Sequence, residues 1–451
     1  MNDRTPVDDL VAADEGMGKR FIELRDAISA PASSLSSPWT AEDHSRVGRH
    51  QAANRLAGLL SEIREKKQFA DFMSLPSDPQ RLTAYALNGP IIFVNSSKFG
   101  SDALIITAQD VTSVPLPKFE REDILRNYEM LFAAIGALGS EQPNIKEANE
   151  EYEKVMTWLW EAVAKPVLDS VDFSQYNVVP DAKPRLFWVS TGFIGVFPIH
   201  ACGQFNSLGR SGTSDTVHDR VISSYIPSLR ALAYARDRLE RISQQTKFEK
   251  VRALLVGMPT TPGMDPLDVR GELGTVKQKI EIAFDVVEIY TPMRDQVLRN
   301  LKLCSLVHFA CHGVADPDDP SMSTLRLEDW MENPLSVRTL LKTSLSSCQL
   351  AYLSACESAR NKDMLLRDEG INIAGAFHMA GVPHTISTLW PISDTLSSTV
   401  ASAFYEGLLG ENNTVDINRS ARALHSAIGR QRRHVPPVEP ILWGAYIHSG
   451  A

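Results

Sequence analysis

The stretch LVHFACHG at residues 306–313 decides the fold, because it reads as a buried strand that runs directly into reactive side chains. Its apolar residues face both sides, which is typical of a strand inside a parallel sheet. A second stretch of this kind, LAYLSACES at residues 350–358, follows later in the chain. Reactive groups in open α/β sheets gather at the carboxyl ends of the strands. We therefore expect the reactive side chains that follow the two strands to lie on neighbouring crossover connections.

His312 and Cys356 follow the two strands and form a candidate catalytic dyad. A free thiol has a pKa near ~8.5 and only its thiolate attacks a carbonyl well, so a cysteine nucleophile needs a nearby imidazole. His312 lies 356 − 312 = 44 positions before Cys356, close to the roughly 50-residue separation between these residue types in caspases. Because glycine lacks a Cβ, we assign the oxyanion hole to the backbone N–H groups of Gly313 and Cys356.

Two other reactive residues of the first stretch are assigned structural roles. His308 lies inside the strand and is expected to be a core or supporting histidine. Cys311 precedes the proposed base and should point to the opposite side of the strand. A buried cysteine at a strand end is usually a packing residue. The assignment of Cys356 as the nucleophile therefore depends on its pairing with His312.

The remainder of the second half alternates short apolar runs with longer helical patterns. Parallel strands need such crossovers, so we predict a three-layer α/β/α sandwich with a mostly parallel sheet. Further strands are expected at RLFWVS from 185, RALLVG from 252, DVVEIY from 285 and HTISTLW from 384, with helices at 227–242, 268–282, 369–381 and 396–409.

The first half is expected to be mainly helical at its start. Residues 1–45 are rich in Ser, Pro, Asp and Ala and predict a flexible tail, and a helical period follows from 50 to 72. Two β-rich runs, 90–97 and 103–110, are separated by a turn-like segment and predict a hairpin. Helices are expected at 121–138 and at 146–166, the latter ending at Pro166.

Composition excludes several classes of protein. Apolar residues make up 43% and charged residues 22% of the 451-residue chain, whose formal net charge is −9. The acidic sum argues against a nucleic-acid partner, and the basic run at 430–433 is expected to be a solvated helix end. A nucleotide-binding protein is disfavoured because the chain lacks both GxxxxGK[ST] and GxGxxG loops.

The cysteine pattern and the first residues bear on redox state and location. Five cysteines without CxxC spacing suggest neither a disulfide framework nor a zinc site, so we expect a reducing compartment and no metal or cofactor. The acidic first residues do not resemble a signal peptide, and no apolar run reaches membrane-spanning length. We expect no membrane partner and a cytoplasmic location, with the nucleus as an alternative.

Four blocks of this sequence resemble the signature blocks of CHAT domains, which are caspase-like domains of the same protease clan as caspases, separases and gingipains. Earlier segments, beginning with GPIIFVNSSKFGSDALII from 89, are similar to fungal members, so the resemblance covers about 80–451. It implies cysteine endopeptidase activity with His312 and Cys356 at the catalytic positions. The blocks, in the family's order, are VHFACHG (307–313), LAYLSACES (350–358), RDEGINIAGAFHMAGVPHTISTLWPISD (367–394) and ILWGAYIHSG (441–450).

The resemblance also suggests a division of the chain and two departures from the family. Ser358 stands where many relatives carry Thr, and no 34-residue period of upstream tetratricopeptide repeats is found. We expect a flexible N-terminal tail at 1–45, a helical extension at 46–80 and a CHAT domain at 81–451, with a pseudo-half at about 81–180 and a catalytic half at about 181–451.

Asp394 has two interpretations. It lies 394 − 356 = 38 positions after Cys356, where several members of the clan carry an acidic residue of the substrate pocket, and a carboxylate there would favour Arg or Lys. Alternatively, Asp394 caps the helix that follows it.

The leading function is a regulated cysteine endopeptidase that cleaves protein substrates, with cleavage after a basic residue as one reading. A regulatory protein is a second expected partner. The alternative is a catalytically silent caspase-like scaffold in a signalling or defence assembly, in which packing retains Cys356.

Overall fold

The computed structural model describes residues 5–29, 41–70, 72–73, 82–140, 143–176, 183–190, 192–205, 215–245, 251–316, 318–355, 358, 372–410 and 414–451. Two compact units make up the chain, residues 1–81 and residues 82–451. Each unit has a hydrophobic core of its own.

The first unit is helical. Leu10, Phe21 and Ile63, one from each of its helices, are buried in a common cluster. The carboxylate of Asp14, between the first two helices, pairs with Lys66, and this hydrogen bond lowers the pKa of Asp14. Its helices are α1 (Thr5–Ala13), α2 (Glu15–Ser29) and α3 (Ala41–Glu65).

The expected flexible tail at 1–45 is therefore wrong for residues 5–29. Their apolar side chains are spaced to meet α3, and burial in that contact stabilises helices that composition alone does not predict. The Ser- and Pro-rich residues 30–40 lie outside the described residues.

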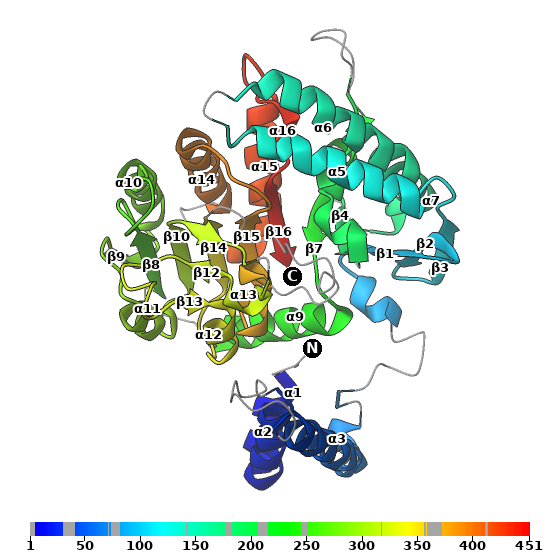
Figure 1. Ribbon diagram of the computed structural model, residues 1–451, viewed down its shortest axis with the longest axis vertical. Helices are drawn as coiled ribbons and strands as arrows, with labels where there is room; N and C mark the ends of the chain where they lie inside the picture. Colours follow the sequence, from blue (N-terminus) through cyan, green and yellow to red (C-terminus); the bar gives the residue numbers. More distant parts are fainter. Residues whose placement is uncertain are drawn as a thin grey trace. The chain divides into compact units, whose positions relative to one another are not determined.

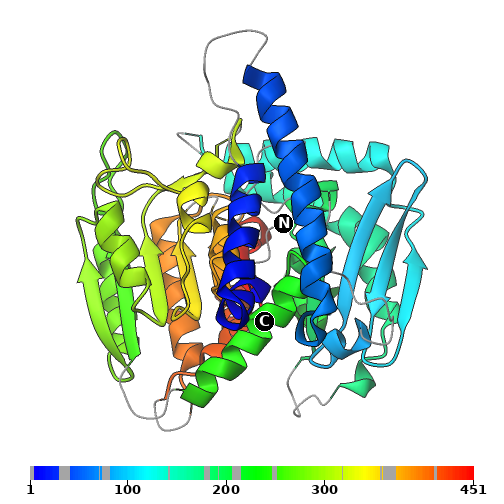
Figure 2. The ribbon, with the colours of Figure 1, turned by 90° about the horizontal axis from the view of Figure 1, so that it is seen from below.

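An eleven-stranded sheet runs through residues 82–451, in the order β3-β2-β1-β4-β7-β16-β15-β14-β10-β8-β9. Figure 2 shows β1 to β3 at one side of this unit and β8 and β9 at the other. Its strands are β1 (Ile91–Ser97), β2 (Gly100–Ile106), β3 (Val111–Pro115), β4 (Arg185–Ser190), β7 (Ile222–Tyr225), β8 (Val251–Gly257), β9 (Phe284–Ile289), β10 (Leu306–Ala310), β14 (Leu350–Ser354), β15 (His384–Thr388) and β16 (Tyr446–Gly450).

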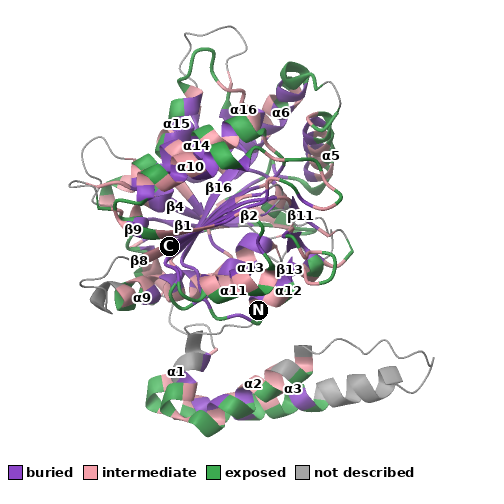
Figure 3. Cartoon of the chain, turned by 90° about the vertical axis from the view of Figure 1, so that its left-hand side faces the viewer, coloured by how far each residue is buried: buried purple, intermediate pink, exposed green. Residues whose placement is uncertain are grey.

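Helices cover both faces of the sheet (Figures 1 and 3). One face carries α5, α6, α10, α14, α15 and α16, and the other carries α9, α11, α12 and α13. The predicted three-layer α/β/α sandwich with a mostly parallel sheet is confirmed. These helices are α5 (Arg121–Ala137), α6 (Ile145–Leu159), α9 (Leu229–Gln245), α10 (Val269–Ile280), α11 (Arg294–Leu301), α12 (Val337–Leu341), α13 (Ile373–Met379), α14 (Asp394–Leu408), α15 (Ser420–Arg432) and α16 (Pro440–Trp443).

Apart from β2 and β3, which pair antiparallel at one edge, the sheet consists of two parallel sets of strands that run in opposite directions. One set is β1, β4, β7 and β16, and the other is β15, β14, β10, β8 and β9. The direction changes between β15 and β16, which are antiparallel. Strand β4 lies beside β1 and β7 lies beside β4, although the expected boundary near residue 180 assigned both to the catalytic half.

The predicted hairpin is confirmed, because β1 and β2 pair antiparallel. The helix predicted to end at Pro166 is wrong. Helix α6 ends at Leu159 and a π-helical turn follows, so that Pro166 lies in the first turn of α7 (Lys165–Ser170). Proline is tolerated there because the first N–H groups of a helix need no partner within the helix.

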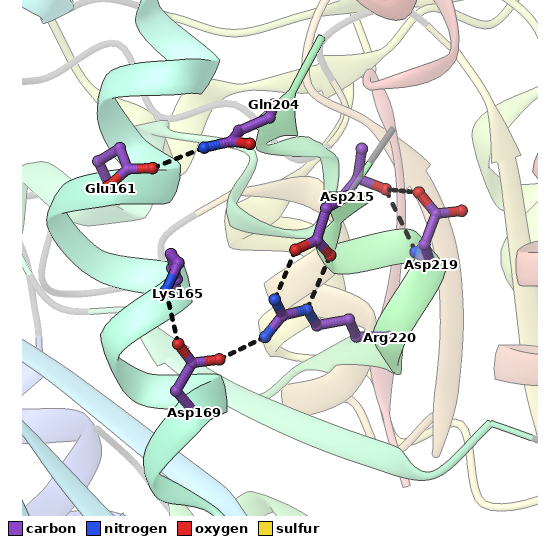
Figure 4. A network of polar contacts seen from close by, with 8 residues as sticks. Glu161, Lys165, Asp169, Gln204, Asp215, Asp219 and Arg220 are labelled. Atoms are coloured by element: carbon purple, nitrogen blue, oxygen red, sulfur yellow. Dashed lines mark hydrogen bonds and ion pairs between the residues drawn. The ribbon is translucent and has the colours of Figure 1, made fainter. Parts of the chain in front are cut away.

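Polar contacts fasten α7 to the short helix α8 (Val217–Arg220), as Figure 4 shows. Arg220 donates from Nε to Asp215 at 2.8 Å and from a terminal nitrogen to Asp169 at 2.6 Å. The hydrogen bond to Asp215 is the main cause that raises the pKa of Arg220. Because a guanidinium binds carboxylates in a fixed planar geometry, this network orients the segment that leads into β7.

A chain of buried polar side chains joins the two sets of strands. Arg185 on β4 donates to Ser224 Oγ on β7 at 2.5 Å, and Ser224 contacts His448 Nδ1 on β16 at 2.8 Å. His448 Nε2 lies 3.1 Å from His384 Nδ1 on β15. Burial lowers the pKa of His384 to about 3 and that of His448 well below its usual range.

Acid should therefore destabilise the protein. The unfolded chain binds protons near pH ~6.5, whereas the buried rings resist protonation, so this part of the stability is complete above pH ~6.5 and is lost as the pH falls. Burial lowers the pKa values of His200 and His378 to about 4, so these two residues also contribute to the loss of stability as the pH falls. We expect the free energy of unfolding, measured by urea titration, to fall steeply from pH 7 to pH 5.

A matched pair of variants tests this account. His384→Asn should reduce the pH slope of the unfolding free energy by up to about 1.4 kcal/mol per pH unit, because one proton fewer is taken up. His434→Asn, at an exposed position, should leave the slope unchanged. Equal slopes for wild type and His384→Asn would contradict the account.

Candidate active site

The parallel pairing of β10 with β14 sets the geometry of the site. Leu306 lies opposite Leu350, and all five pairs of the ladder keep the same offset, 350 − 306 = 44 positions. The offset between His312 and Cys356 is identical, 356 − 312 = 44. Each of these residues follows its strand by two positions in the sequence.

The His312 ring is half-buried and is held by a backbone carbonyl. Its Nε2 lies 2.8 Å from the carbonyl oxygen of Asp265. Because a carbonyl oxygen only accepts, this contact assigns the ring proton to Nε2 and leaves Nδ1 as the basic nitrogen.

The segment that carries Asp265 is itself fixed at several points. The Met258 N–H donates to the Ala310 carbonyl at 2.9 Å, which ties the end of β8 to the end of β10. Trp330 Nε1 donates to the Pro262 carbonyl at 3.2 Å. The orientation of His312 thus depends on contacts that hold the segment after β8 to the end of β10 and to Trp330.

Gly313 begins β11 (Gly313–Val314), which pairs antiparallel with β12 (Thr324–Leu325). The Arg326 N–H donates to the His312 carbonyl at 2.9 Å. In an antiparallel ladder, hydrogen-bonded and non-hydrogen-bonded pairs alternate. The next pair, Gly313 with Leu325, is therefore of the second kind, and the Gly313 N–H points away from β12.

Ala355 and Ser358, which lie on either side of the proposed nucleophile in the sequence, are both anchored to Thr388 at the end of β15. Thr388 Oγ1 donates to the Ala355 carbonyl at 3.1 Å, and the Thr388 N–H donates to Ser358 Oγ at 3.2 Å. Ala355 and Ser358 are buried. Cys356 itself lies outside the described residues.

A cleft opens over these strand ends, and three of its lining residues are acidic. Asp268 and Glu272 come from the start of α10, and Asp394 comes from the start of α14. None of the described lining residues is Lys or Arg. The lining consists of Leu267, Asp268, Val269, Glu272, Ala310, Cys311, His312, Ser354, Ala355, Thr388, Ile392, Asp394 and Ser397.

The capping interpretation of Asp394 is wrong. Ser393 is the N-cap of α14, with its hydroxyl accepting from the Leu396 N–H at 3.4 Å. Asp394 is the first helical residue, and its Oδ2 accepts the Asp268 N–H at 3.0 Å. Its carboxylate therefore lines the cleft that contains His312.

His308 and Cys311 have the structural surroundings expected of them. His308 is fully buried, with Nε2 3.0 Å from Glu272 Oε1 and Nδ1 3.1 Å from the Tyr405 hydroxyl. Its ring stacks on Tyr352 at 4.7 Å. Cys311 is buried in the core cluster on the face of α11 to α13, and it also contributes to the lining of the cleft that contains His312.

Sequence reasoning missed Asp265, Asp268, Glu272 and the anchoring role of Thr388. A signal for the first three existed, since they follow β8, a third parallel strand whose carboxyl end opens at the same edge. The role of Thr388 has no such signal, because it depends on which strand lies next to β14.

The described part of the chain shows neither a metal cluster nor a membrane span. No three His, Cys, Asp or Glu side chains among the described residues converge as metal ligands. No helix in the same part of the chain has the length and apolarity needed to cross a bilayer.

Removing the Thr388 hydroxyl should loosen the anchor. Thr388→Val leaves the buried Ala355 carbonyl without its donor, so we expect a loss of about 1–3 kcal/mol in the free energy of unfolding measured with urea. Thr388→Ser keeps the donor and should lose less. Equal losses for the two variants would contradict the anchoring role.

Comparison with known proteins agrees with this architecture. Separase in the separase–securin complex of Saccharomyces cerevisiae superposes with a TM-score of 0.51 and 12% identity, over 93% of this chain and 34% of that chain. RgpB of Porphyromonas gingivalis, solved with its pro-domain, gives a TM-score of 0.42 and 12% identity, over 64% of this chain and 69% of that chain. The chain thus spans about a third of the separase chain, and no curated protein matches it. A family model described as the CHAT domain matches residues 153–451, more than half of the sequence, so the chain belongs to the CHAT domain family.

Proposed function

We propose that the protein is a cysteine endopeptidase in which Cys356 is the nucleophile and His312 the general base. The observation that carries the proposal is the shared offset of 44 positions, which relates His312 to Cys356 by the same register that pairs β10 with β14. The oriented His312 ring supports it, because a base must present a lone pair rather than a proton.

In the proposed reaction, His312 Nδ1 takes the thiol proton while Nε2–H stays on the Asp265 carbonyl. The thiolate attacks the substrate carbonyl, and the outward-facing Gly313 N–H stabilises the oxyanion. The imidazolium then protonates the leaving amine. A water molecule, deprotonated by His312, hydrolyses the acyl-enzyme and releases the second product.

The acidic cleft supports cleavage after a basic residue. Asp268 and Asp394 both line the cleft, and the hydrogen bond from the Asp268 N–H at 3.0 Å uses only one carboxylate oxygen of Asp394. Asp394 Oδ1 has no hydrogen-bond partner among the described residues. A guanidinium or ammonium group would pair with it.

A regulatory protein partner is part of the proposal. A peptidase with an assembled cleft needs restraint, and the separase of similar fold was solved in complex with securin. We propose that a protein segment likewise covers the cleft of this chain until cleavage is required.

Removing either member of the dyad should abolish proteolysis. We expect Cys356→Ala to lower kcat/KM by at least about 10⁴-fold and His312→Ala by about 10³-fold or more, because the two act as a unit. Labelling of new protein N-termini in cells, comparing wild type with Cys356→Ala, identifies the cleaved substrates. Unchanged cleavage and autoprocessing in Cys356→Ala would instead support a catalytically silent scaffold.

Asp394 should control the residue preceding the cut. Asp394→Asn is expected to reduce kcat/KM for an Arg peptide by about 10- to 100-fold, the value of a charge-assisted hydrogen bond, with little effect on a Met peptide. Ser393→Ala, which removes only the helix cap, should leave the Arg-to-Met preference unchanged. Cleavage of wild type after Asp alone would contradict the acidic pocket.

A further inference from the structure

Two cysteines lie at the opposite ends of the strands that carry the proposed dyad. Cys304 precedes β10 by two residues and Cys348 precedes β14 by two residues. Their offset, 348 − 304 = 44, again equals that of the β10–β14 ladder. The register that relates His312 to Cys356 at one end thus relates these two cysteines at the other.

The chain segments that hold the two cysteines are in direct contact. The Ser305 carbonyl accepts the N–H groups of Gln349 at 2.7 Å and Leu350 at 3.2 Å. Neighbouring strands lie about 4.8 Å apart, and a disulfide needs a Cα–Cα distance of about 4.4–6.8 Å. The backbone spacing therefore suits a disulfide without movement of the sheet.

The side chains also meet. Cys304 and Cys348 are fully buried in one core cluster. A hydrogen bond with Cys348, together with burial, raises the pKa of the Cys304 thiol. A thiol with a raised pKa, such as that of Cys304, is mostly protonated at neutral pH, which slows its oxidation but does not change the geometry of the pair.

Small oxidants have a short route to the pair. Lys302 and Leu303 are exposed directly before Cys304, and Ser346 and Ser347 are exposed directly before the other cysteine. Local opening of such surface turns costs less free energy than opening of the sheet.

We propose that Cys304 and Cys348 are a disulfide-forming site that a hydroperoxide oxidises, linking β10 to β14 at the end opposite the cleft. One thiolate attacks the peroxide oxygen and the O–O bond breaks, which gives a sulfenic acid; the leaving oxygen takes up the thiol proton and departs as water from hydrogen peroxide or as an alcohol from an alkyl hydroperoxide. The second thiol then attacks the sulfenic sulfur and releases water. Two thiols lose two protons and two electrons, which the peroxide takes up.

The test uses the full chain carrying Cys356→Ala, which keeps only Cys202, Cys304, Cys311 and Cys348. The folded protein is treated with hydrogen peroxide, denatured and alkylated with iodoacetamide, and the alkyl groups are counted by intact mass. We expect two groups instead of four, and a linked peptide pair that contains Cys304 and Cys348. Four groups, or a link to another cysteine, would overturn the proposal.

Two further variants in the same background serve as controls. Cys202→Ala leaves the pair intact, so treatment should reduce its three alkylated thiols to one. Cys304→Ala lacks one member of the pair, so all three of its remaining thiols should still be alkylated after the treatment. A disulfide between residues 44 positions apart also restricts the unfolded chain. The oxidised Cys356→Ala protein should therefore have a higher Tm than its reduced form. An unchanged or lower Tm would count against a disulfide that fits the native register.

Discussion

The parallel register of β10 and β14 is the constraint on which the site depends. One offset of 44 positions runs along the whole ladder, and the same offset in sequence recurs just beyond each end. At the carboxyl ends it relates a histidine to a cysteine, in the middle it stacks His308 on Tyr352, and at the amino ends it relates two thiols. A one-residue slip would move every one of these side chains to the other face of the sheet.

The register alone does not orient the residues of the site. Hydrogen bonds from the neighbouring strands and the segments that follow them also hold these residues. The segment after β8 presents the Asp265 carbonyl to His312, and the end of β15 holds Ala355 and Ser358 through Thr388. Ser358 provides a hydroxyl acceptor, which a threonine would also provide. The departure from the family at this position therefore preserves the contact.

Much of the fold was predictable from residue patterns, because buried parallel strands read as continuous apolar runs. Strands β7 and β16 were not predicted, since each is short and is defined by pairing with strands distant in the sequence. The flexible tail predicted from composition is wrong for residues 5–29, because their helices are stabilised by apolar contacts with α3.

For the site, the sequence predicted the residues at strand ends but not their supporting contacts. His312 and Asp394 line one cleft, as the pocket interpretation required, whereas the role of Ser393 as the cap of α14 was missed. The local sequence offers two adjacent capping residues, Ser393 and Asp394. Only the approach of Asp268 selects between them.

The central claim is that His312 activates Cys356, and thiol reactivity tests it without knowledge of any substrate. The measurement is the rate of Cys356 alkylation by iodoacetamide at pH 6.5, followed by peptide mass spectrometry. We expect the rate to fall at least about tenfold in His312→Ala, because a thiol without an imidazole partner is mostly protonated at this pH, and to stay unchanged in His434→Ala. Equal rates in wild type and His312→Ala would contradict the account.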